Sequence, residues 1–195
     1  MAKPETLKLV LNEQHIDANV VEKINGAYGN VNNKSSKKKK AEYLFHAVNE
    51  MDRLLDKDTR QRLMELCACT LDSSGLNKTV AQFANKTKGL SLKEKVVKLG
   101  EIDHLGKPAL RKDGTILVDL GRGAACPCPQ IAGVEVTCPI SFTYCMCCGG
   151  HLKFQYENAL GIRLEVEIKS SILQSMGKTP CVFILRDREK KPGSS

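Results

Sequence analysis

Six of the nine cysteines in this chain of 195 residues lie between positions 126 and 148. Four of these six form two Cys-x-Cys pairs. One of the other two lies between the pairs, and the last directly follows the second pair. A thiol can be a metal ligand, a nucleophile, a disulfide partner or a small buried apolar side chain. The six candidates are Cys126, Cys128, Cys138, Cys145, Cys147 and Cys148.

The expected redox compartment narrows these choices. The first residues lack the apolar segment of a signal peptide, and no stretch approaches the ~20 apolar residues of a membrane helix. We therefore expect a cytoplasmic protein without membrane contact, where thiols stay reduced. The odd number of cysteines also argues against a fully paired disulfide framework. Metal ligation, thiol chemistry and packing remain as interpretations.

The two Cys-x-Cys pairs predict a metal site if both lie on strands. Side chains two residues apart on a strand point to the same face. Two adjacent strands would then present the sulfurs of Cys126, Cys128, Cys145 and Cys147 on one surface, which suits zinc or an iron–sulfur cluster. Structural zinc sites usually place two to four residues between paired cysteines, however, so a reactive or redox thiol and plain packing stay open.

The second pair also suggests nucleophilic chemistry. Cys147 and Cys148 precede Gly149 and Gly150, and a helix is predicted from about residue 150. A helix N-terminus lowers the pKa of a nearby thiol, and His151 could carry a proton for an attacking thiolate. The two glycines would let a ligand approach the backbone N–H groups. The plainer alternative is that they only form a tight turn and that the histidine is exposed.

The remaining cysteines look structural. Cys67 shares an apolar helical stripe with Leu63 and Leu71, and Cys181 begins an apolar strand. On a helix, Cys67 and Cys69 would point about 200° apart, so they could serve one metal only if the helix ended there. We expect packing for Cys67 and Cys181.

The elements that must position these residues fall into two halves. Apolar spacing predicts a helix over 41–55, and Asp58 and Ser91 are expected to cap two later helices. After residue 106 the pattern changes to short strands, with alternation over 134–138 and again over 164–169. The predicted fold is α+β: an N-terminal helical bundle followed by a small, mostly antiparallel sheet with one packed helix. Strands are expected at 116–120, 134–138, 141–147, 164–169 and 181–185, and the packed helix at 150–160.

This pattern suggests four regions along the chain. They are an N-terminal helix with a basic linker (1–40), a helical region (41–106), a cysteine-rich α+β region that binds ligand or metal (107–187) and a flexible tail (188–195). The net charge is +8, and the run Lys37 to Lys40 contributes much of it. Basic residues interleaved with aromatic ones are typical of nucleic-acid platforms, and that pattern is lacking. We expect a solvated basic loop and no nucleic-acid partner.

The C-terminal third resembles a known group of domains. Its segments Cys148-Gly-Gly-His, Leu160-Gly-Ile-Arg-Leu-Glu-Val-Glu-Ile, Ser171-Ile-Leu and Gly177-Lys-Thr-Pro-Cys181-Val-Phe are similar to the closing signature of 4-vinyl-reductase-like domains. A similar ending occurs in L-2-amino-thiazoline-4-carboxylate hydrolase-like proteins. The likeness covers residues 125–185 well and 58–100 loosely, and the Cys-x-Cys pairs resemble an uncharacterised bacterial branch. Ser170-Ser171 stands where many members have a further cysteine.

The resemblance implies a small ligand-binding domain, of sensor or accessory type, for hydrophobic or heterocyclic molecules. Together with the cysteines it predicts a cytoplasmic domain that binds a small molecule and zinc or an iron–sulfur cluster. The alternative is a thiol-dependent hydrolase acting on a small heterocyclic or carbonyl substrate, with Cys147 or Cys148 as nucleophile and His151 as proton carrier. A small-molecule ligand is the expected partner, and a homodimer is left open.

Overall fold

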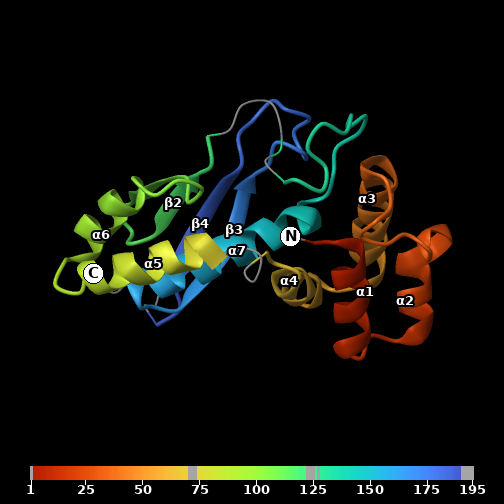
Figure 1. Cartoon of the computed structure of the whole chain (residues 1–195), viewed down its shortest axis with the longest axis horizontal. Coiled ribbons are helices and arrows are strands. Elements are labelled where there is room, and N and C mark those ends of the chain that lie inside the picture. The colour runs from red at the N-terminus through yellow and green to blue at the C-terminus, as the bar shows by residue number, and fades with distance from the viewer. Residues whose placement is uncertain (1, 70–73, 122–125, 127, 190–195) are drawn as a thin grey trace.

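The computed structural model describes residues 2–69, 74–121, 126 and 128–189, and it has the predicted α+β architecture. Helices α1, α2 and α3 stand together at one end of the molecule, and α5, α6 and the sheet lie at the other (Figure 1). The elements are α1 (Pro4–Glu13), α2 (Ala18–Asn25), the 3-10 helix η1 (Gly26–Tyr28), α3 (Lys37–Leu54), α4 (Lys57–Leu66), α5 (Ser74–Lys86), α6 (Leu92–Leu99), β1 (Lys107–Leu110), β2 (Ile116–Asp119), α7 (Phe142–Leu160), β3 (Leu164–Ser170) and β4 (Val182–Asp187).

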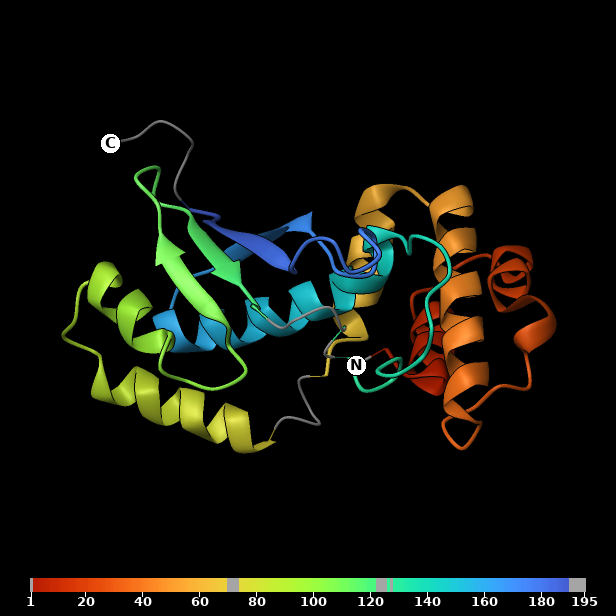
Figure 2. The same cartoon turned by 90° about the horizontal axis from the view of Figure 1, so that it is seen from above.

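The four strands form one antiparallel sheet with the order β1-β2-β4-β3. The predicted pairing of the last two strands is confirmed, and Val166 lies opposite Leu185. Leu164 is buried whereas Glu165, Glu167 and Lys169 are exposed. The alternation of apolar and charged residues in the sequence therefore matches the alternation of inward and outward side chains on the strand. Helix α7 lies against one face of the sheet (Figure 2).

Helix α7 connects the two halves because it contributes to two apolar cores. One core joins its first turns to α1–α4, and the other joins its later turns to the sheet, α5 and α6. The helix begins at Phe142, where the Ser141 side chain accepts a hydrogen bond from Thr143 N. It ends at Leu160 and is capped by Gly161, whose φ of +72° is in the left-handed region that glycine favours.

The start of α7 overturns two predictions. Residues 141–147 are the N-cap and first turns of a helix and not a strand, and residues 134–138 are irregular. The β-branched and aromatic residues before Cys145 resemble a strand, but packing on both sides of α7 outweighs their weak local preference. The two Cys-x-Cys pairs therefore do not lie on neighbouring strands.

Helix starts were predicted with mixed success. The capping box of Ser91 and Glu94 is confirmed, with both reciprocal hydrogen bonds formed. Helix α4 is capped by Asp56 and not by Asp58: the Asp56 side chain accepts a hydrogen bond from Thr59 N at 2.8 Å. The expected basic linker ends earlier than predicted, because residues 37–40 form the first turn of α3 behind the Ser36 cap. No helix among the described residues is long and apolar enough to cross a membrane.

Candidate functional site

The thiols of α7 lie inside the protein and not at an exposed helix start. Cys145 and Cys147 are buried, and the Cys145 thiol lies 3.0 Å from Ser171 Oγ. Burial, with added repulsion from neighbouring thiols, raises the pKa of Cys147 to about 12 and that of Cys148 well above its usual range. The prediction that the helix N-terminus lowers these pKa values is wrong, because both thiols lie in the second turn of α7 among apolar side chains. Neither is a ready nucleophile.

Gly149 and Gly150 serve close packing in the middle of α7. A Cβ on Gly149 would lie 3.2 Å from Val166 Cγ1 of β3, and a Cβ on Gly150 would lie 2.8 Å from Glu65 Cα of α4. The two glycines thus let a strand and a helix approach α7 from different sides. Both alternatives considered for these residues, a tight turn and a ligand at the free N–H groups of a helix start, are wrong, because the two glycines lie inside α7.

The first Cys-x-Cys pair packs against the start of α7. Cys128 is buried, and its Sγ lies 3.1 Å from the Tyr144 hydroxyl. Cys126 is partly buried against the same core. Beyond the main effect of burial, the charge of Cys128 also raises the pKa of Cys145 and Cys147, so these thiols influence one another.

This gathering of thiols does not reproduce the geometry from which a metal site was predicted. Among the described residues, no group of three or more His, Cys, Asp and Glu side chains is arranged so that it could hold a metal ion. The metal site therefore stays a prediction. The two neighbouring strands from which it was predicted are not present, because Cys145 and Cys147 lie in α7 and Cys126 and Cys128 lie outside the strands. Cys67 and Cys181 are buried in the two cores as expected, and Cys138 is exposed.

The thiol with the most distinctive surroundings is Cys69. Helix α4 ends at Leu66, and the Cys67 carbonyl accepts a hydrogen bond from Cys147 Sγ at 3.4 Å, which ties the end of α4 to α7. Two residues later the chain places Cys69 Sγ at 3.4 Å from His151 Nδ1. Both side chains of this Cys69–His151 pair are partly exposed. A reagent in solution can therefore reach them.

The electrostatics of the pair favour a thiolate. Burial by itself raises the pKa of Cys69, but the opposing effects, led by the hydrogen bond and positive charge of His151, outweigh it and lower the pKa to about 7. At pH 7 such a thiol is about half ionised, compared with about 1% at its usual pKa of 9.0. A low pKa and partial exposure together mark reactive cysteines.

Two polar contacts from residues just after His151 hold α7 to its neighbours. Lys153 Nζ lies 2.7 Å from Glu65 Oε2 of α4, and Gln155 Nε2 donates to Asn77 Oδ1 of α5 at 2.6 Å. Gln155 is fully buried, and its Oε1 has no hydrogen-bond partner among the described residues. The imidazole thus stands on a helix that is fixed to both of its neighbours.

Sequence reasoning found one member of the pair and missed the other. His151 was expected to carry a proton, but for Cys147 or Cys148. Cys69 was overlooked because the helix was expected to continue to about Leu71, which would have turned its side chain away. Cys69 could have been recognised only if the helix had been predicted to end before it, and α4 does end at Leu66.

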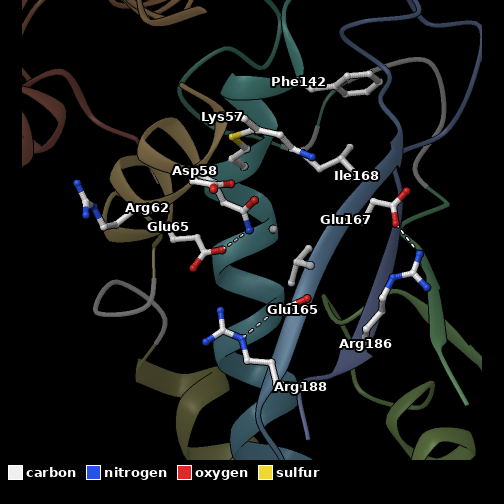
Figure 3. Close-up of a pocket in the computed structure, with 14 residues that line it drawn as sticks. Lys57, Asp58, Arg62, Glu65, Phe142, Glu165, Glu167, Ile168, Arg186 and Arg188 are labelled. Atoms are coloured by element: carbon white, nitrogen blue, oxygen red, sulfur yellow. Dashed lines mark hydrogen bonds and ion pairs between the residues drawn. The ribbon is translucent and has the colours of Figure 1, made fainter. Parts of the chain in front are cut away.

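Two cavities lie near these elements. The larger, of about 810 Å³, runs between α4 and β3 over the surface of α7 (Figure 3). The smaller, of about 250 Å³, is mostly apolar and lies between the segment from Cys126 to Val136 and the turn from Ile172 to Gly177. Among the described side chains, neither Cys69 nor His151 lines the larger cavity.

Comparison with known proteins gives a family but no function. Residues 8–191 match the Family of unknown function (DUF6144). No curated protein matches the chain, and no solved structure does.

Proposed function

For a chain that belongs to the Family of unknown function (DUF6144), we propose a thiol-dependent hydrolase in which Cys69 is the nucleophile and His151 is its proton carrier. The observation that carries this proposal is the 3.4 Å contact between Cys69 Sγ and His151 Nδ1, together with the lowered pKa of that thiol. Compared with the sequence-based hypothesis, the histidine keeps its role and the nucleophile changes.

The pair supplies both functions that acyl transfer requires. The Cys69 thiolate attacks the electrophilic carbon of a small carbonyl or heterocyclic substrate, and the electron pair of the C=O or C=N bond moves to its heteroatom. When this intermediate collapses, the leaving group departs with a proton from His151. With a carbonyl substrate the product of this step is a thioester. Water then attacks the thioester and gives a proton to His151, and collapse of this second intermediate releases the acid and the Cys69 thiolate.

Other cysteines are less suited to this role. The thiols of Cys67 and Cys147 have pKa values raised to about 12, mainly by burial. At pH 7 both are therefore almost entirely protonated, whereas about half of Cys69 is ionised. Cys138 is exposed but lies outside the helices and strands. The reduced thiol that the mechanism needs fits the cytoplasmic location expected from the sequence.

An activated ester tests the proposal on the full chain. With p-nitrophenyl acetate we expect a rapid release of about one p-nitrophenolate per chain as Cys69 is acetylated, followed by slower turnover. Cys69→Ser should abolish the rapid phase, and Cys138→Ser, which removes an exposed thiol elsewhere, should leave it unchanged. Peptide mapping by mass spectrometry locates the acetyl group. A rapid phase that persists in Cys69→Ser would refute the assignment.

The binding-only hypothesis, a domain that holds a small molecule and zinc or an iron–sulfur cluster, remains the alternative. Its support is the gathering of Cys126, Cys128, Cys145 and Cys147 in and against one core. Metal content distinguishes it from the hydrolase, as described below.

A further inference from the structure

A second thiol lies on the same side of α7 as His151. Cys147 precedes His151 by four residues, and residues at this spacing are neighbours on one face of a helix. The Cys147 thiol donates a hydrogen bond to the Cys67 carbonyl at 3.4 Å. Cys69 Sγ lies 3.4 Å from His151 Nδ1. The chain that leaves α4 therefore touches α7 at two points one helical turn apart, and each of the two contacts includes a thiol.

The sulfurs of Cys69 and Cys147 are within reach of each other. Four residues of an α-helix rise about 6 Å, which is the separation of the two contacts along α7. Cys69 follows the Cys67 carbonyl by two residues, and two residues of chain span at most about 7 Å. Cys69 lies between α4 and α5 and outside both helices. Its side chain can therefore move by one turn along α7 without unwinding a helix.

The surroundings of the two thiols suit two successive steps. Cys69 is partly exposed, and the hydrogen bond and charge of His151 outweigh burial and lower its pKa to about 7. Peroxides oxidise the thiolate form of cysteine. Cys147 is buried, and its sulfur accepts a hydrogen bond from Ala2 N at 3.1 Å. A peroxide in solution therefore meets Cys69 first, while Cys147 stays a protected thiol beside it.

The two thiols also interact electrostatically. Burial is the main cause of the raised pKa of Cys147, and the charge of Cys69 adds to it. Such an effect requires the two sulfurs to lie near each other, in agreement with the contacts to Cys67 and His151. A solvent-accessible thiolate with a second cysteine close by is the arrangement found in redox-sensing cysteines.

From these contacts we propose that Cys69 and Cys147 form a redox pair that reacts with hydroperoxides. The Cys69 thiolate attacks the terminal oxygen of the hydroperoxide, the O–O bond breaks, and the leaving alkoxide or hydroxide takes a proton from His151. The Cys147 sulfur then attacks the sulfenic acid on Cys69, the S–O bond breaks, and the hydroxide leaves as water with the proton of the Cys147 thiol. One hydroperoxide is reduced to an alcohol or to water, and two thiols are oxidised to one disulfide.

The disulfide has a consequence for the proposed hydrolase. It removes the Cys69 thiolate from which acyl transfer starts, so oxidation turns that activity off and a dithiol reductant restores it. This regulatory consequence rests on the proposed function, whereas the oxidation itself does not, because it needs no ester or heterocyclic substrate.

Peroxide treatment of the full chain tests the redox pair. With one equivalent of hydrogen peroxide at pH 7, we expect the mass of the chain to fall by about 2 Da, because two thiol hydrogens are lost. Fragmentation of the cross-linked peptide should assign the bridge to Cys69 and Cys147, and dithiothreitol should remove it. In Cys147→Ser the sulfenic acid on Cys69 should persist and give at least about tenfold more dimedone adduct than in the native chain.

Two further variants separate the resolving thiol from general effects on the fold. Cys145→Ser is the matched control, because it removes a buried thiol two residues earlier in α7, where the sulfur contacts Ser171 Oγ. This variant should keep the bridge. Cys147→Ala introduces no buried hydroxyl and should lose the bridge as Cys147→Ser does.

Four outcomes would overturn the proposal. They are no oxidation of Cys69, a bridge from Cys69 to a cysteine other than Cys147, a bridge between two chains, and a sulfenic acid that persists equally in the native chain and in Cys147→Ser. The p-nitrophenyl acetate assay on reduced protein keeps the two proposals apart. A Cys69 that is acetylated but never bridged ends the redox pair alone, whereas a bridge without acetylation ends the hydrolase alone.

Discussion

The substitution His151→Gln should shift the pH dependence of Cys69 reactivity to higher pH. In the native protein the pKa of Cys69 is about 7, and its Sγ lies 3.4 Å from His151 Nδ1. Glutamine keeps a polar side chain of similar size and removes the positive charge. Without that charge the pKa of Cys69 should rise toward its usual value of 9.0. The thiolate fraction at pH 7 would then fall from about one half to about 1%.

The effect on rate is smaller than this 50-fold loss because a more basic thiolate is a better nucleophile. With a Brønsted coefficient of about 0.45, a rise of 2 pKa units increases thiolate reactivity toward a disulfide about eightfold. The net expectation is that His151→Gln reacts about sixfold more slowly than the native protein at pH 7. Above about pH 8, where the native thiol is already ionised, the variant should become the faster of the two.

The assay is the reaction of the folded protein with 2,2′-dithiodipyridine from pH 6 to pH 10. Mass spectrometry of peptides at early times assigns the modified cysteine. His46→Gln is the matched control, because His46 contacts the Lys23 carbonyl and the Tyr28 ring and not a thiol. If His151 only controlled access to Cys69, the ratio of the two rates would not vary with pH. A constant ratio would therefore refute the ion-pair explanation.

Three other outcomes are expected. Gly150→Ala should destabilise the fold by about 1–3 kcal/mol in urea unfolding, because its Cβ would lie 2.8 Å from Glu65 Cα; Gly149→Ala, which meets a movable methyl at 3.2 Å, should be close to neutral. Cys181→Ser should cost about 1–3 kcal/mol by burying a hydroxyl, and Cys138→Ser, which is exposed, should change stability by less than about 0.5 kcal/mol. If Cys126, Cys128, Cys145 and Cys147 hold a metal, anaerobically purified protein should contain about one equivalent of zinc, or iron, that Cys128→Ser loses; negligible content would end that prediction.

Local sequence signals predicted the elements that local interactions determine. Helix α6 starts at the Ser91 capping box, whose two hydrogen bonds span three residues. The pairing of β3 with β4 follows from the alternation of Leu164, Val166 and Ile168 with charged residues. In both cases the deciding contacts lie within one turn or one hairpin, so the pattern in the sequence is also the pattern in space.

The errors occur where contacts distant in sequence decide. Residues 142–147 have the composition of a strand but lie in a helix that is buried on several sides, so tertiary packing outweighs propensity. The alternation of Val134 and Val136 finds no partner strand among the described residues. Gly149 and Gly150 signal a close approach, as glycines often do, but the approaching atoms belong to β3 and α4 and not to a ligand.

The contrast between Cys67 and Cys69 shows why the candidate site depends on where one helix ends. The two cysteines are two residues apart, yet burial raises the pKa of Cys67 to about 12 whereas that of Cys69 is lowered to about 7. Cys67 is the C-cap of α4 and still faces the core. Had α4 continued for another turn, the side chain of Cys69 would point about 200° away from that of Cys67, which is buried in the core that the first turns of α7 share. The helix ends instead at Leu66, and the chain that leaves it can bring a second thiol to α7 beside His151. The chain that leaves α4 therefore presents one inert thiol and one thiol that is about half ionised at pH 7, and the proposed chemistry requires α4 to end at Leu66.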